Sequence, residues 1–239
     1  DGQVEWHQIG ERSAAVGASW TSQGLVLFLS VSDSISFNGN TFYNESGSPT
    51  PDRDNIVLLA DSDGNVIWHQ IMTGIDNPPI YATSFNDNLF VVQGRFDAEL
   101  IYDGQTMTTN GFTLYQLAFN LSDGSREWMK KSSGSSGVYS NVSVVFQDSL
   151  FASIGLYHEN MNFQGNSISE NGFGADGFIM MQRIDDGSVL WLNSFGGERE
   201  DAVYDVCVYC IDVSKVMVDE VFVRVNGCSQ VIVVNKGVL

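Results

Sequence analysis

The feature of this sequence that most restricts its fold is a short string that occurs four times at nearly constant spacing. An Asp-Gly pair, three variable residues and a tryptophan occupy positions 1–6, 63–68, 123–128 and 186–191. The repeated tryptophans are 62, 60 and 63 residues apart, and they are Trp6, Trp68, Trp128 and Trp191. Repetition at a fixed period is the signature of a repeat architecture. We therefore predict structural units of about 60 residues, with one shared turn position at Gly2, Gly64, Gly124 and Gly187.

The residues between the tryptophans predict short strands. A six-residue pattern occurs at 37–42, 102–107 and 163–168. It consists of an aromatic residue, any residue, Gly, an amide residue, a hydroxyl residue and an apolar residue. Segments rich in Val, Ile, Phe, Tyr and Thr alternate with turns rich in Gly, Asn, Asp and Ser, which is typical of strands. In the second unit we expect strands at Val66–Ile71, Ile80–Phe85, Leu89–Phe96 and Phe112–Phe119. The Asp-Gly glycine supplies the positive φ of the turn before the tryptophan strand.

Four strands in about 60 residues are typical of a β-propeller blade, so the predicted fold class is all-β, a single propeller domain. The approximate units are 10–71, 72–131, 132–194, and 195–239 together with 1–9. An N-terminal strand that pairs with the last unit would close the ring and remove two exposed sheet edges. The alternative is an open wedge that completes itself with neighbouring chains.

Two repeat families share parts of this pattern. The stretch Phe195–Val203, and Asp176–Ile179 followed by Asp186-Gly187, resemble the SBBP-type β-propeller repeat of bacteria. The step from the Asp-Gly turn to the tryptophan is similar to the tryptophan-docking repeat of quinoprotein-like propellers. Both resemblances imply a propeller fold and neither fixes a function, because propellers carry many unrelated activities. The SBBP likeness implies a secreted or surface-attached protein.

The charge balance restricts the partners. The chain has 29 acidic residues against 11 Lys and Arg, a formal net charge of −18. Such a surface repels phosphate backbones and anionic lipid, so we expect no nucleic-acid partner. No apolar run approaches the roughly 20 residues of a membrane-spanning helix, so we expect no membrane insertion.

The aromatic and histidine residues are interpreted as parts of the repeat. His7 and His69 both lie in the string Trp-His-Gln-Ile, and His158 has an unrelated repeat position, so duplication explains the pair better than a metal or catalytic site does. The four repeated tryptophans are expected to pack between adjacent units. Trp20 lies outside the repeated tryptophan position and is the candidate ligand-binding residue, as a platform for a sugar.

The acidic turns and the cysteines leave alternatives open. Asp61–Asn65 and Asp185–Gly187 faintly resemble calcium loops, but the further ligands and the bidentate Glu of such a loop are absent, so calcium is the lesser alternative to hairpin chemistry. We predict no other cofactor and no metal. The cysteines are Cys207, Cys210 and Cys228. One of the first two bonded to Cys228, or three buried thiols, both fit the pattern.

Three sequons make candidate glycosylation sites at Asn44, Asn120 and Asn141. No Ser-His-Asp arrangement, phosphate loop or paired-carboxylate signature is found in the sequence. We therefore expect a non-enzymatic extracellular or cell-surface scaffold or adhesion module that contacts other protein chains, including copies of itself in an array or filament. A carbohydrate-binding, lectin-like propeller is the alternative, with a glycan as ligand. The third hypothesis is a propeller enzyme with a site in the central channel.

Overall fold

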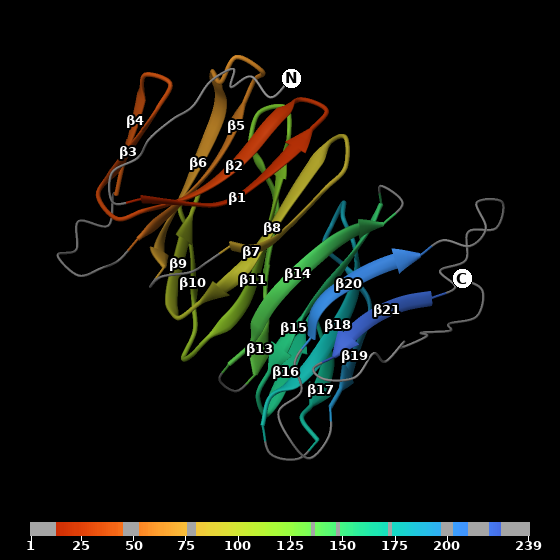
Figure 1. Cartoon of the computed structure of the whole chain (residues 1–239). Helices are drawn as coiled ribbons and strands as arrows, with labels where there is room; N and C mark the ends of the chain where they lie inside the picture. Colours follow the sequence, from red (N-terminus) through yellow and green to blue (C-terminus); the bar gives the residue numbers. More distant parts are fainter. Residues whose placement is uncertain are drawn as a thin grey trace.

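Every regular element that the structure describes is a β-strand (Figure 1). The computed structural model describes residues 13–44, 53–75, 80–134, 137–146, 149–171, 174–196, 203–209 and 220–225. Within these ranges there is no helix, and hence none that could cross a membrane. The predicted all-β class is confirmed.

The strands form antiparallel sets of four with one topology, and each set defines a unit. Unit 1 is β1 (Ser13–Thr21), β2 (Gly24–Val31), β5 (Asp54–Ala60) and β6 (Val66–Ile75), which are four neighbouring strands of a six-stranded sheet. Unit 2 is β7 (Ile80–Phe85), β8 (Leu89–Phe96), β11 (Thr113–Asn120) and β12 (Arg126–Lys131). Unit 3 is β14 (Tyr139–Phe146), β15 (Leu150–Tyr157), β18 (Asp176–Arg183) and β19 (Val189–Phe195). The described part of unit 4 is the hairpin β20 (Val203–Tyr209) and β21 (Glu220–Val225).

Between its second and third strands, each of units 1 to 3 carries an inserted hairpin that was not predicted as strands. The hairpins are β3 (Ser34–Phe37) with β4 (Asn40–Tyr43), β9 (Ala98–Tyr102) with β10 (Gln105–Thr108), and β16 (Asn160–Phe163) with β17 (Asn166–Ser169). Two residues of positive φ close each one: Asn38 and Gly39, Asp103 and Gly104, Gln164 and Gly165. Two consecutive positive φ values define the turn that matches strand twist best. The repeated aromatic-x-Gly landmark is therefore a hairpin tip.

β-bulges recur at equivalent places and show that unit 4 begins as the others do. The first strand of every unit carries one register shift, at Ala15/Gly17, Ile80/Ala82, Ser140/Val142 and Val203/Asp205. A second shift lies beside each tryptophan of units 1 to 3, where Ile67, Glu127 and Leu190 are the extra residues. A bulge adds one residue and changes which side chains face which way.

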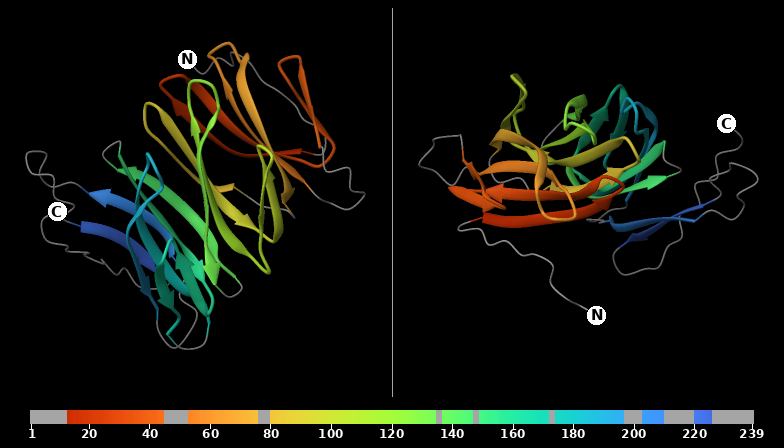
Figure 2. Two further views of the ribbon diagram at one scale, coloured as in Figure 1. Left: turned by 180° about the vertical axis from the view of Figure 1, so that it is seen from behind. Right: turned by 90° about the horizontal axis from the view of Figure 1, so that it is seen from above.

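The units stand in a curved row, with the red strands of unit 1 at one end and the blue hairpin β20–β21 at the other (Figures 1 and 2). Each sheet has a forward face toward the next unit and a rear face toward the preceding one. Phe28 on the forward face of unit 1 stacks on Phe90 on the rear face of unit 2, with ring centroids 5.3 Å apart. The inserted hairpin lies on the rear face, as Leu100 and Tyr102 join the same core cluster.

The described sheets form an open row and do not join into a ring. The predicted closing strand at 1–9 and the end of unit 4 lie outside the described residues. The four strands expected for the second unit coincide with β6, β7, β8 and β11, although β6 continues to Ile75. Their grouping is corrected by the structure, because β6 belongs to the sheet of unit 1 and the fourth strand of unit 2 is β12.

Candidate functional site

The most elaborate contacts of the described chain are the joints between units, where a tryptophan of one unit meets the Asp-Gly turn of the next. Trp68 comes from β6 of unit 1 and is 7% exposed. Its indole Nε1 donates a hydrogen bond of 2.7 Å to the carbonyl of Leu121 in unit 2. Its ring stacks on Phe119 at 6.4 Å between centroids. A buried indole whose N–H donates such a hydrogen bond contributes a large apolar contact area and is also held in one orientation.

The second joint repeats the first in its details. Trp128 of unit 2 is 8% exposed and donates from Nε1 to the Ile184 carbonyl of unit 3 at 2.9 Å. Its ring stacks on Phe151 at 6.2 Å. Trp191, the tryptophan of unit 3, is half-buried. Trp6 lies outside the described residues, as does Gly2.

The turn glycines allow both the backbone conformation of the turn and the close packing of the tryptophan in the joint. Gly64, Gly124 and Gly187 have φ values of 79°, 72° and 67°. A Cβ on Gly124 would lie 2.7 Å from the ring of Trp68, and one on Gly187 would lie 3.0 Å from the ring of Trp128. Only glycine adopts this φ freely and also leaves room for the indole. The repeated Asp-Gly therefore has a structural reason beyond the hairpin.

The turn of unit 1 differs from those of units 2 and 3. Its closing backbone pair is Asp61 with Asn65, while the closing pairs of the other two turns span one residue more. Asp61 corresponds to Asn120 and Arg183 of the other turns. The turn of unit 1 is therefore one residue shorter than the turns in which the carbonyls of Leu121 and Ile184 receive the indoles. It does not have the same geometry as the turns of units 2 and 3 that receive an indole.

Short strand pairings between units strengthen the same joints. Thr73 at the end of β6 pairs with Ile101 in the hairpin of unit 2. β13 (Ser133–Gly134), which follows β12, pairs with β16 in the hairpin of unit 3. The inserted hairpins thus connect neighbouring units through backbone hydrogen bonds.

The acidic side chains of the turns accept hydrogen bonds within their own turns. Ser125 donates to Asp123, which lowers the pKa of that carboxyl, and the backbone N–H of Ser125 lies 2.8 Å from Asp123 Oδ1. Ser188 likewise lowers the pKa of Asp186, and Asn65 that of Asp61. Hydrogen bonds to the charged form stabilise it. These contacts are those of turn formation, and no group of three or more metal-ligating side chains occurs among the described residues.

A buried polar cluster lies between units 2 and 3. Gln93, Gln116, Ser153 and Gln182 are all fully buried. Gln116 and Gln182 exchange amide hydrogen bonds of 2.8 Å in both directions. Ser153 Oγ donates to Gln93 Oε1 at 2.8 Å. Polar networks that are satisfied within a core specify one packing arrangement, so this cluster fixes how unit 3 sits on unit 2. It was not predicted, although an amide inside an otherwise apolar strand is a visible signal.

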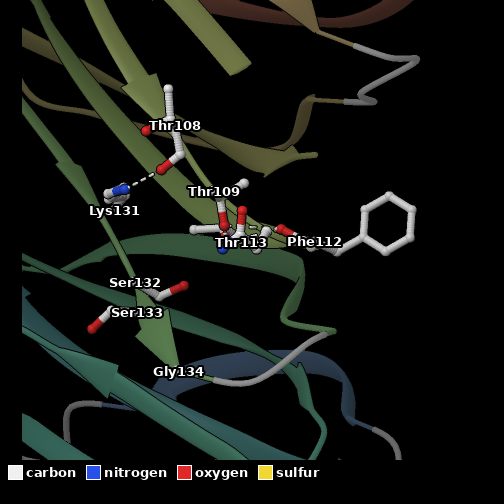
Figure 3. A pocket seen from close by; sticks show the side chains of 10 residues that line it. Thr108, Thr109, Phe112, Thr113, Lys131, Ser132, Ser133 and Gly134 are labelled. Atoms are coloured by element: carbon white, nitrogen blue, oxygen red, sulfur yellow. Dashed lines mark hydrogen bonds between the residues drawn. The ribbon is translucent and has the colours of Figure 1, made fainter. Parts of the chain in front are cut away.

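One small pocket lies at the loop from β10 to β11 and the end of β12 (Figure 3). It encloses about 170 Å³ and is lined by hydroxyl groups and by Lys131. Lys131 Nζ donates to the carbonyl of Thr108, and the hydroxyls of Thr109 and Thr113 are 2.5 Å apart. The ring of Phe112 points away from these groups. Pockets for drug-sized ligands are larger, about 300–1,000 Å³, and the polar groups here bond to one another.

Trp20, the predicted sugar platform, is 62% exposed. It lies in β1, outside the repeated tryptophan position, as the sequence indicates. Trp20 pairs with Leu25 as Phe85 pairs with Phe90 in unit 2, whereas Val145 pairs with Phe151 at the corresponding place of unit 3. Trp20 thus occupies a regular position of its unit, and among units 1 to 3 an aromatic residue at this position is shared by units 1 and 2 only.

The histidine and sequon predictions fall at ordinary structural positions. The ring of His69 lies 4.8 Å from the ring of Phe42, on the hairpin of its own unit. Asn44 donates from Nδ2 to the Ser32 carbonyl. Asn120 is part of the unit 2 turn and donates from Nδ2 to Glu127. Asn141 lies in β14 at the bulge, and nothing further is described of its side chain.

The cysteine predictions lie at the edge of the described structure. Cys207 belongs to β20, where it pairs through the backbone with Phe222. Cys210 and Cys228 lie outside the described residues, so the alternatives for the three thiols stay as predictions.

No protein-family model matches this chain, and no curated protein matches it significantly. The likeness to the SBBP-type repeat therefore stays a hypothesis that rests on the quoted residues.

Proposed function

We propose that this chain is a non-enzymatic scaffold whose units bind one another face to face and which contacts other protein chains outside the cell. The observation that carries the proposal is the repeated joint: the Trp68 and Trp128 joints use equivalent donors, acceptors and glycines. Repeats that contact only their neighbours build extended surfaces from one interface. A fold of this kind supports binding through its faces and edges.

The finer architecture that we propose is a propeller of four blades. Its support is the common topology of units 1 to 3 and the bulged hairpin with which unit 4 begins. Small-angle scattering tests it. A closed, compact ring of 239 residues should have a radius of gyration of about 18 Å, whereas an open row should be clearly larger. Closure by the N-terminal strand stays a prediction that this measurement decides.

Electron microscopy of the native protein, combined with light scattering, tests the scaffold itself. We expect rings, rows or filaments that contain several chains. Discrete single chains at all working concentrations, with no protein captured by cross-linking on the source cells, would contradict the proposal. The extracellular location rests on the resemblance in sequence, and protease treatment of intact source cells tests it, because an external protein is digested without lysis.

A carbohydrate-binding function is the second candidate, favoured by the exposure of Trp20 and Tyr43 at 62% and 63%. Exposed aromatic rings offer flat apolar surfaces of the kind that sugars stack on. A glycan array tests it, with the Trp20→Ser variant as control. A bound glycan that the variant no longer binds would favour the lectin function over the scaffold.

A further inference from the structure

The rear face of unit 1 has no preceding unit in the described structure, although the same face is an interface elsewhere in the row. Trp20 and Leu25 are register partners, and strand alternation places Leu25 on the same face as Leu27 and Leu29. Residues of this face in unit 2, such as Phe90 and Val92, are fully buried against unit 1. The equivalent Leu25 and Leu27 are half-buried, and Trp20 is 62% exposed.

This contrast identifies what would cover the face. In unit 2, Phe90 is the register partner of Phe85 and stacks at 5.3 Å on Phe28, which belongs to the forward face of the preceding unit. The natural cover of a rear face in this fold is therefore the forward face of another unit. The described hairpin of the last unit, β20–β21, is not in that place, because it lies at the opposite end of the row (Figure 2).

We propose that the rear face of unit 1, centred on Trp20, binds the last unit of a second copy of this chain, head to tail. The proposal rests on the scaffold function and on the open wedge as the alternative to a ring closed within one chain, and it names the partner. Such an interface is heterologous, and repetition of it generates either a ring of copies or an open filament. Both copies carry a net charge of −18, so screening of their repulsion by salt should strengthen the contact.

Photo-crosslinking with isotope-mixed copies tests the geometry. A benzophenone side chain replaces Trp20 in ¹⁵N-labelled protein, which is mixed with unlabelled protein and irradiated. We expect mass spectrometry to find peptides of unit 4, around 203–225, from the unlabelled copy. Crosslinks only within one copy would show ring closure and overturn the proposal while leaving the propeller architecture intact. Crosslinks to other surfaces, or none, would overturn it as well. The same group at exposed Thr106 in unit 2 is the matched control and should not crosslink to unit 4.

Sedimentation velocity gives the energetic test. Trp20→Ser should weaken self-association at least about tenfold, whereas Trp20→Phe should stay within about threefold of the native chain. Ile67 is 49% exposed in the bulge of β6, and Ile67→Ser serves as the exposure-matched control, with association unchanged. Equal loss in Ile67→Ser, or no loss in Trp20→Ser, would overturn the proposal. Loss of glycan binding in Trp20→Ser without any change in association would assign Trp20 to a sugar instead. If microscopy shows assemblies that Trp20→Ser leaves unchanged, the scaffold stands and this interface falls.

Discussion

The substitution Gly124→Ala tests whether the turn of one unit is pressed against the indole of the unit before it. Gly124 has a φ of 72°, and a Cβ there would lie 2.7 Å from the ring of Trp68. Carbon atoms attract one another best at about 3.5–4.0 Å, so the contact is strongly repulsive. Trp68 cannot move away easily, because its Nε1 is bonded to the Leu121 carbonyl.

The magnitude follows from two separable costs. An alanine held at positive φ loses about 1–2 kcal/mol of stability. Overpacking a well-packed site costs about 1–3 kcal/mol more. Gly104 supplies the matched control in the same unit, since its φ is 67° and a Cβ added there would meet nothing within 4 Å. Gly104→Ala therefore carries the backbone cost without the contact, and Gly124→Ala should exceed it by about 1–3 kcal/mol.

Urea unfolding followed by near-ultraviolet circular dichroism measures both variants, with midpoints compared at constant slope. Unit 3 offers an independent pair, in which Gly187→Ala brings its Cβ 3.0 Å from Trp128 and Gly165→Ala meets nothing within 4 Å. We expect the excess cost in unit 3 to be smaller than in unit 2. If Gly124→Ala cost no more than Gly104→Ala, the turn would not be seated on the indole, and the joint would have to be explained by the surrounding side chains.

Three further predictions concern the joint, the turns and the buried cluster. Trp128→Phe removes the hydrogen bond to the Ile184 carbonyl and should lower the free energy of unfolding by about 1–3 kcal/mol; an equal melting temperature would contradict it. The Asp123 carboxyl, whose pKa is lowered mainly by its side-chain hydrogen bond with Ser125, stabilises the fold above its unfolded pKa of about 4. That contribution is lost as the pH falls, so Asp123→Asn should lose less stability than the native chain between about pH 6 and pH 3. Gln116→Leu leaves buried amide groups without partners and should cost about 1–3 kcal/mol in urea unfolding, whereas no cost would show that the cluster is dispensable.

Repeated features were predictable from the sequence, because each copy confirms the others. The strands β6, β7, β8 and β11 and the shared turn glycine could be located in this way. The features that occur once could not. Gln93 stands where unit 1 has Phe28, and Gln116 where it has Val57, so the amide cluster belongs to one joint only. Its partners Gln116 and Gln182 are 66 residues apart, and no local pattern connects them.

The inserted hairpins were missed for a different reason. Their turn landmark was visible at Phe37, Tyr102 and Phe163, but β4, β10 and β17 are only four residues long. They alternate polar and apolar residues too briefly to give a periodic signal. Their role becomes visible only in three dimensions, where the aromatic residue before each turn is buried on the rear face of its own unit.

The bulge before each tryptophan explains how two residues that are two positions apart can face opposite sides of the same sheet. Residues two apart on a strand face the same side, yet Val66 packs with the rear-face cluster of unit 1 and Trp68 with the forward one. The extra residue Ile67 reverses the alternation, as Glu127 does before Trp128.

Deletion of Ile67 would leave Val66 and Trp68 adjacent, opposite Ala60 and Leu59, and regular alternation then keeps Trp68 on the forward face. The joint with unit 2 should therefore still form: the deletion should cost much less than the loss of a buried tryptophan, about 3–5 kcal/mol, and the fluorescence of Trp68 should remain that of a buried indole. Ile67→Thr keeps the bulge and, at a half-exposed site, should change stability by no more than about 0.5 kcal/mol. A deletion that costs as much as the loss of a buried tryptophan and exposes Trp68 would mean that the bulge itself is needed to place the indole in the joint. Gly124 in the turn of unit 2 covers Trp68 of unit 1. Each copy of the Asp-Gly-x-x-x-Trp string therefore contributes a glycine to the joint with the preceding unit and a tryptophan to the joint with the next unit. Duplication of a unit thus supplies both halves of a new interface.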